Sequence, residues 1–214
     1  MRLRLPLGRS VLFLAALAFA LVALLPLRVA AGWFGLDGRG LSAREASGSL
    51  WSGALKEARF GPVPLGDLRA RLDVLPLLLG RARLRLSRDE AQGRLDGAVT
   101  VTRHGFAVED LTGQVRLGGL FGPAPLAALD LADVSARFEG GLCESAEGQV
   151  RAGLSGELAA SNLSGTARCA EGALLLPLAG QSGAERLDLS IRGDGRWRIE
   201  ATLGASVRRI EGSF

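Results

Sequence analysis

The chain has 214 residues, of which 48% are hydrophobic and 22% are charged, which is typical of a protein with a packed core and argues against disorder. With one His, two widely spaced Cys and no Tyr, the composition excludes a zinc site of the usual Cys/His kind and a Tyr acid–base group. The formal net charge is +4, and Arg2, Arg4 and Arg9 contribute three of these charges. Because the other Arg residues alternate with Asp and Glu, the basic patch that nucleic-acid binding needs is missing.

An uncharged apolar segment follows the basic N-terminus and extends from Val11 to Leu27. Its length approaches the roughly 20 residues that a helix needs to cross a bilayer, and its small flanking residues extend it. The positive-inside rule places the preceding Arg residues in the cytoplasm. We therefore predict a cytoplasmic tail at residues 1–9, a transmembrane signal anchor at 10–31 and an exported domain at 32–214.

Basic and aromatic residues flank the predicted helix, as is usual at a membrane interface, namely Arg9, Arg28, Trp33 and Phe34. A cleaved signal peptide is the alternative, because residues 29–31 (Val-Ala-Ala) resemble a small-residue cleavage site. Both interpretations send the rest of the chain across the membrane.

The exported region alternates between apolar and polar residues with a period of two, most clearly at 68–74, 82–87, 132–139, 187–192 and 197–202. This period predicts strands with one buried and one solvent face, and such one-sided sheets are antiparallel. Turn sequences separate the runs, and the one at 193–195 predicts a hairpin. Residues 75–80 and 119–129 interrupt the pattern, and we expect a helical turn starting at Pro76 and a short cover, respectively.

A loose pattern of an apolar residue, a polar residue and Gly recurs around Gly97, Gly113, Gly148 and Gly165. We interpret these glycines as strand-start positions that permit a bulge or a bend, and repeated bends curve a sheet. The sequence therefore predicts an all-β domain: a long curved antiparallel sheet, like a half-barrel or β-groove, with an apolar concave face.

Cys143 and Cys169 lie in the predicted exported domain, where two Cys usually form a disulfide. Closing a loop of about 25 residues would stabilise the fold by roughly 3–4 kcal/mol. Two free buried thiols are the alternative. The chain contains no Cys-x-x-Cys sequence, which argues against a thiol oxidoreductase.

Candidate catalytic residues are isolated. His104 lies in a predicted turn without a recognisable Ser or Cys nucleophile motif around it, and the acidic pairs at 89–90 and 109–110 are expected in solvated turns. Neither a metal motif nor a nucleotide motif is found. The sequence thus predicts no enzyme activity, no cofactor and no metal.

One short segment places a Trp among small residues, namely Gly48, Ser49, Leu50, Trp51, Ser52 and Gly53. A core Trp packed over Gly is one explanation, and a recognition edge or membrane-near contact is the other. A membrane segment followed by this motif resembles the general secretion pathway protein N family of type II secretion systems. The Leu-Pro-Leu-Leu-Leu-Gly sequence at 75–80 and the sequences that follow Cys143 and Cys169 are also similar to that family.

The resemblance implies a single-pass protein of the bacterial inner membrane with a periplasmic C-terminal domain. It implies an accessory component of protein secretion that acts through contacts with other inner-membrane or periplasmic secretion proteins, without enzyme activity. The chain is shorter than typical members of the family and its loops are compressed, so the resemblance does not extend to partner contacts that the loops of other members make. The expected curved sheet also resembles AsmA-type envelope proteins, which are membrane-anchored β-grooves, and in that alternative the partner is lipid.

Overall fold

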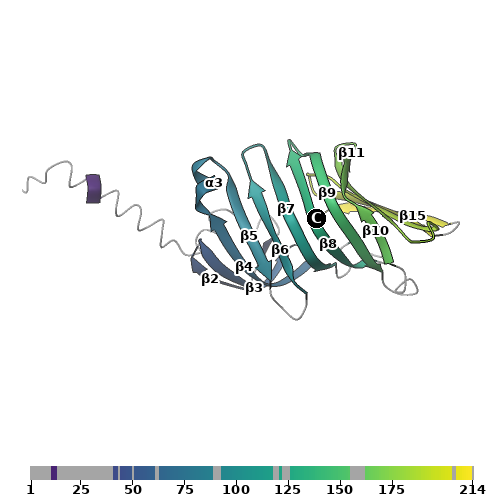
Figure 1. Ribbon diagram of the computed structural model, residues 1–214, viewed down its shortest axis with the longest axis horizontal. Helices are drawn as coiled ribbons and strands as arrows, with labels where there is room; N and C mark the ends of the chain where they lie inside the picture. The colour runs from purple at the N-terminus through teal and green to yellow at the C-terminus, as the bar shows by residue number, and fades with distance from the viewer. Residues whose placement is uncertain are drawn as a thin grey trace, which may run out of the picture.

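The computed structural model describes residues 11–13, 41–42, 44–49, 51–60, 63–88, 93–117, 121, 126–154, 162–203 and 206–213. Almost all of them belong to one antiparallel sheet (Figure 1), so the prediction of a long antiparallel all-β fold is confirmed. Residues 11–13 are helical, and the rest of the predicted membrane segment lies outside the described residues. The strands are β1 (Leu41–Ser42), β2 (Glu45–Ser49), β3 (Ser52–Phe60), β4 (Val63–Asp73), β5 (Ala82–Arg88), β6 (Leu95–Val101), β7 (Gly105–Arg116), β8 (Leu126–Glu139), β9 (Leu142–Leu154), β10 (Asn162–Thr166), β11 (Arg168–Ala170), β12 (Ala173–Ala179), β13 (Glu185–Ile191), β14 (Arg196–Leu203) and β15 (Ser206–Ser213).

The sheet is open. Its strand order runs from β1 through β3–β10 and β12–β14 to β15, while β2 also pairs with β3 and β11 pairs with β12. In Figure 1 the C-terminal strands run at a steep angle to β4–β9, so the sheet curls without closing into a barrel. The predicted hairpin at 193–195 joins β13 to β14.

Register shifts interrupt several ladders of the described sheet, and three of the bulges contain a non-glycine residue with positive φ: Glu57, Asp110 and Asp133. A bulge bends its strand and increases the local twist. The predicted glycines lie within strands rather than at their starts. Gly148, for example, faces the Asp133 bulge so closely that a Cβ atom would come within 2.5 Å of the Asp133 carbonyl oxygen.

The main core lies between the curled C-terminal strands. Its largest fully buried side chains come from β9, β10 and β12–β14, namely Val150, Leu163, Leu178, Leu187, Leu189 and Ile199. Phe121 and Trp197 pack edge to face there, with ring centroids 4.9 Å apart. A smaller cluster of Leu55, Ala58, Leu68 and Leu95 covers the other end of the sheet. The apolar face is therefore packed at the C-terminal end.

The expected helical turn is present as α3 (Val74–Leu78), which begins two residues before Pro76. The Pro76 carbonyl accepts hydrogen bonds from the backbone N–H groups of Leu79 and Arg81. Of the expected cover at 119–129, residues 126–129 belong instead to β8, and residues 119–120 and 122–125 lie outside the described residues. Phe121 is the one residue described between 118 and 125, and it is buried.

Candidate interaction surfaces

The Trp-containing motif forms the tip of the β2–β3 hairpin. Ser49 pairs with Ser52, and the Ser52 backbone N–H donates to Ser49 Oγ at 3.3 Å. Gly48 has φ +89°, and a Cβ atom there would lie 2.6 Å from the Ser52 carbonyl oxygen, so the turn requires glycine. Trp51 is half-buried at the tip, and Leu50 lies outside the described residues. The motif is thus a tight hairpin at the end of a strand pair, a position that sequence reasoning did not predict.

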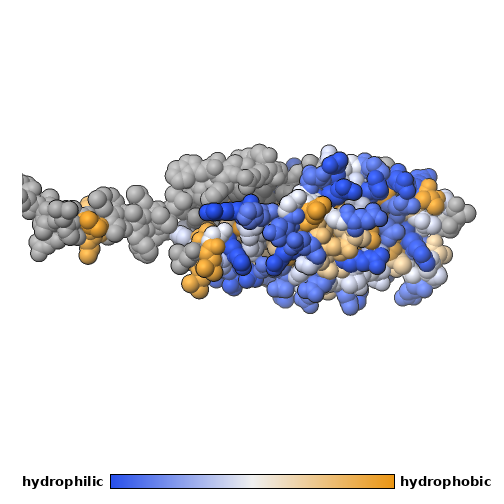
Figure 2. All heavy atoms as spheres, turned by 90° about the horizontal axis from the view of Figure 1, so that it is seen from above, coloured by the Kyte–Doolittle hydropathy of each residue, from blue (hydrophilic) through white to orange (hydrophobic). Residues whose placement is uncertain are grey.

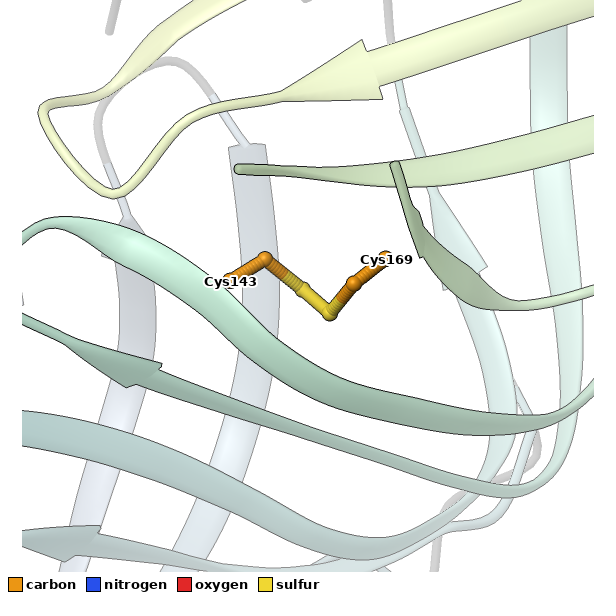
Figure 3. The surroundings of a disulfide bond; sticks show 2 residues. All are labelled: Cys143 and Cys169. Atoms are coloured by element: carbon orange, nitrogen blue, oxygen red, sulfur yellow. A yellow bond between two sulfur atoms is a disulfide. The ribbon is translucent and has the colours of Figure 1, made fainter. Parts of the chain in front are cut away.

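Cys143 and Cys169 form the predicted disulfide, with their Cα atoms 5.6 Å apart. The bond joins the start of β9 to the short strand β11 (Figure 3), so it links two strands that are not neighbours in the sheet order. Phe106 and Phe138 stack nearby at 4.8 Å between centroids and share a cluster with both cysteines. The disulfide therefore fixes the curl of the sheet where β11 lies against the start of β9.

A polar network crosses β4–β7 on the face opposite the apolar one. Asp73 Oδ2 accepts from Arg85 at 3.0 Å, Arg83 contacts Glu109 Oε2 at 2.8 Å, and Thr100 Oγ1 donates to Glu109 Oε1 at 3.0 Å. Glu109 is a half-buried strand residue rather than the solvated turn residue that the sequence predicted. Its sequence neighbour, Asp110, is the bulge residue, and residues 89–90 lie outside the described residues.

The same polar face is hollowed beside this network. A hollow of about 890 Å³ is lined by side chains that include Arg69, Arg71, Asp96 and the hydroxyls of Ser47 and Ser87. Arg69 and Arg71 form no ion pair with the described residues. These groups can bind polar or charged surfaces by hydrogen bonds. Among the described residues of the lining there is no His or Cys that could activate a hydroxyl as a nucleophile.

His104 is exposed in the turn between β6 and β7, as predicted. It borders a second hollow of about 650 Å³, which is also lined by residues 79–81 directly after α3. Among the described residues, no group of three or more His, Cys, Asp or Glu side chains is placed to hold a metal ion.

One ion pair shifts an acid's pKa at the β13–β14 hairpin. Hydrogen bonds from the Arg196 side chain and backbone N–H, the side chain first, lower the pKa of the exposed Asp194 below its ordinary value. The Arg196 side chain donates to Asp194 Oδ2 at 2.7 Å, and its backbone N–H donates to Asp194 Oδ1 at 3.0 Å. The pair closes a turn and does not prepare an acid for catalysis.

Arg88 is a buried charge that the sequence analysis did not identify. Its side chain is 7% exposed and donates to the carbonyl oxygens of Leu65 and Gln114 at 2.6 Å and of Gly93 at 2.9 Å. It links β4, β7 and the start of the β6 segment. The alternation of its strand predicted the buried face correctly, but it gave no reason to expect an Arg on that face.

The predicted membrane-interface residues Arg9, Arg28, Trp33 and Phe34 lie outside the described residues. No helix within the described part of the chain is long and apolar enough to cross a membrane.

The described residues form an all-β protein that is built on one open sheet, and a disulfide cross-links this sheet. Their surface carries polar and charged groups that can bind a partner. The family model for type II secretion system (T2SS), protein N, matches residues 39–209, about four fifths of the chain. The chain belongs to this family, which confirms the resemblance found in its motifs. No curated protein and no solved structure matches the chain.

Proposed function

We propose that this protein is an accessory component of a type II secretion system that acts by binding other components of the apparatus. The observation that carries the proposal is the family match, which spans the sheet from β1 into β15. The scarcity of paired catalytic groups among the described residues supports binding over chemistry.

We further propose that the chain is anchored in the bacterial inner membrane by residues 10–31, with the sheet in the periplasm. The charged N-terminus and the apolar segment support this orientation. The disulfide supports an oxidising compartment on the outer side of the membrane.

The contact that we favour is strand addition at β15. This strand is the last in the sheet order and has eight residues, whereas β1 and β2 at the opposite end have two and five. Its first four side chains, Ser206 to Arg209, are exposed, and cross-strand pairs such as Arg209–Glu200, at 3.0 Å, hold it on β14. An exposed edge strand can pair with an extended segment of a partner.

Site-specific photo-crosslinking in cells tests this contact. A photoreactive residue at Val207 of the full chain should capture a secretion-system protein, identified by mass spectrometry. The matched control is Ser145, an exposed residue in β9, a strand paired on both sides. Adducts from both positions, or from neither, would contradict binding at the β15 edge. Retention of the chain in membranes after carbonate extraction tests the anchor separately.

Lipid binding is the second candidate, and one row of side chains favours it. Leu72, Leu84, Val99 and Val108 lie opposite one another across β4–β7 on the apolar face, and all four are half-buried. Native mass spectrometry of the full chain in mild detergent tests it. Bound phospholipid would support this function, and its absence would remove the candidate.

A further inference from the structure

Exposed apolar side chains gather at one end of the sheet. Apart from residues 11–13, six large hydrophobic side chains are exposed in the described chain. Five of them lie where β4, β6 and β8 end and β5, β7 and β9 begin (Figure 1), namely Val74 (54%), Leu75 (77%), Leu79 (78%), Val101 (45%) and Leu142 (59%). The sixth, Val207 (60%), lies at the opposite end of the sheet, beside the β14–β15 turn. We call the first group of turns the α3 end.

α3 and the residues after it make the most prominent part of this end. Leu75 and Leu79 are more than three quarters exposed, although they belong to a segment of mostly apolar residues. Figure 2 looks onto the molecule from above and shows apolar side chains on its α3 side next to polar ones. Leu side chains this exposed at a protruding turn mark a contact surface, because a monomeric protein gains nothing by hydrating them.

Arginines surround a hollow directly beside these leucines. The hollow, of about 650 Å³, is bordered by Leu79 and lined by Arg81, Arg103 and Arg137. None of the three forms an ion pair with another described residue. Of the acids at the hollow, Glu109 is bound by Arg83 at 2.8 Å, which leaves Glu139 as the opposing charge. The surface therefore combines an apolar tip with an excess of positive charge.

We propose that the α3 end docks on the surface of a phospholipid bilayer. Leu75 and Leu79 enter the boundary of the acyl chains, and the guanidinium groups of Arg81, Arg103 and Arg137 bind lipid phosphates. Apolar side chains that insert, surrounded by basic residues that bind anionic headgroups, are the usual composition of a peripheral membrane contact. Guanidinium groups bind phosphate oxygens in a bidentate way.

The inference rests on the proposed anchor for one point, which is the nearness of the membrane. The predicted helix ends at residue 31 and β1 begins at Leu41, so residues 32–40 span at most about 30 Å. The tether joins the sheet at the end opposite α3, where Leu41 pairs with Phe60 and Phe60 pairs with the first residue of β4. It nevertheless raises the effective concentration of the whole domain at the bilayer, so that even a weak surface contact is occupied.

Fluorescence quenching in vesicles tests the contact on the full chain. A single Cys is introduced at Leu75, or at Val207 as the matched apolar control, and is labelled with an environment-sensitive fluorophore without reducing the disulfide. The protein is reconstituted in vesicles of phosphatidylethanolamine and phosphatidylglycerol that contain nitroxide headgroup lipid. We expect about threefold stronger quenching at Leu75 than at Val207, together with a blue shift of the emission at Leu75.

Charge reversal tests the role of the arginines. The double variant Arg81→Glu, Arg103→Glu should reduce the quenching at Leu75 to the level of Val207, and raised salt should act in the same direction. The control variant Arg186→Glu, Arg208→Glu makes the same change at exposed positions near the opposite end and should leave the quenching unchanged.

Equal quenching at both positions, or quenching at Leu75 that survives charge reversal, would overturn the proposal. Capture of a protein by a photoreactive Leu75 position in cells, without quenching in vesicles, would also overturn it, because the α3 end would then be a protein contact. Neither result changes what the crosslinking at β15 and the carbonate extraction measure. Those two experiments therefore show separately whether the proposed function fails.

Discussion

Gly165 of β10 has no space for a side chain. A Cβ atom there would overlap the carbonyl oxygen of Pro177 in β12. We expect Gly165→Ala to destabilise the protein by about 2–4 kcal/mol, because the backbone of one strand has to move. The control is Gly153→Ala in β9, where the nearest atom to a new Cβ is the Ala128 oxygen at 3.9 Å, and the change should stay within about 0.5 kcal/mol. Urea unfolding followed by Trp fluorescence compares the two, and equal midpoints would contradict the steric account.

Arg88 satisfies three carbonyl groups that have no other described side-chain donor. Arg88→Met keeps much of the side-chain volume but leaves the carbonyl oxygens of Leu65, Gly93 and Gln114 without it, so we expect a loss of about 2–4 kcal/mol. Arg88→Lys preserves the charge, but one ammonium group cannot replace a planar fork that reaches three strand segments, so most of the loss should remain. The same unfolding measurement checks both variants. A fully stable Lys variant would show that the charge matters and the geometry does not.

At the scale of the element, the disulfide holds a strand of three residues. β11 pairs only with β12 in the described sheet, and Cys169 links it to β9. We expect reduction to cost about 3 kcal/mol, because the bond closes a loop with a sequence separation of 26 residues. Thermal unfolding with and without dithiothreitol measures this cost. The double variant Cys143→Ser, Cys169→Ser should unfold at the midpoint of the reduced protein and should not respond to the reductant.

The three bulges that contain a positive-φ residue are held by the same kind of hydrogen bond. The positive-φ residue of each donates its backbone N–H to a side chain of the adjacent strand: Glu57 to Asp67 at 2.8 Å, Asp110 to Ser135 at 3.0 Å and Asp133 to Thr112 at 3.0 Å. Removing such an acceptor leaves the bulge without its fixed partner.

Ser135→Ala should therefore destabilise the protein by about 1 kcal/mol, since it removes one hydrogen bond at the surface. Ser145→Ala in β9, an exposed Ser without a described side-chain hydrogen bond, is the matched control and should change the unfolding midpoint little. If the two variants unfold together, the side chain at 135 does not hold the bulge.

Sequence patterns predicted the strands, the 193–195 hairpin, the disulfide and the turn at α3, because each depends on neighbouring residues or on compartment. The bulges could not be placed, since Asp133 looks like an ordinary alternating polar residue, and Asp110 like a turn residue, until the adjacent strand is known. For the same reason Gly148 was expected at a strand start, whereas it faces a bulge. Glu109 was expected in a turn because its partner Arg83 lies on a different strand. The surfaces formed by several turns could likewise not be predicted from the sequence, because they depend on which strand ends lie side by side in the folded sheet.

At the scale of the whole molecule, the two ends of the sheet differ in how well they are packed. The six large, fully buried side chains all come from β9, β10 and β12–β14. At the other end, β4 and β5 contribute half-buried leucines, such as Leu72 and Leu84, and a small core cluster comes from β3, β4 and β6. Local opening costs least where few apolar contacts hold a strand.

This difference predicts an uneven pattern of hydrogen exchange in the full chain. Amides of β12–β14 should exchange about a hundredfold more slowly than those of β4 and β5, because opening them exposes the main core. Leu189→Ala, a truncation at a fully buried position of β13, should accelerate exchange across β12–β14 and leave β4 and β5 unchanged. Exchange measured by mass spectrometry resolves the two regions as separate peptides. If both accelerate together, the sheet opens as one cooperative unit, and β4 and β5 are held as firmly as the main core.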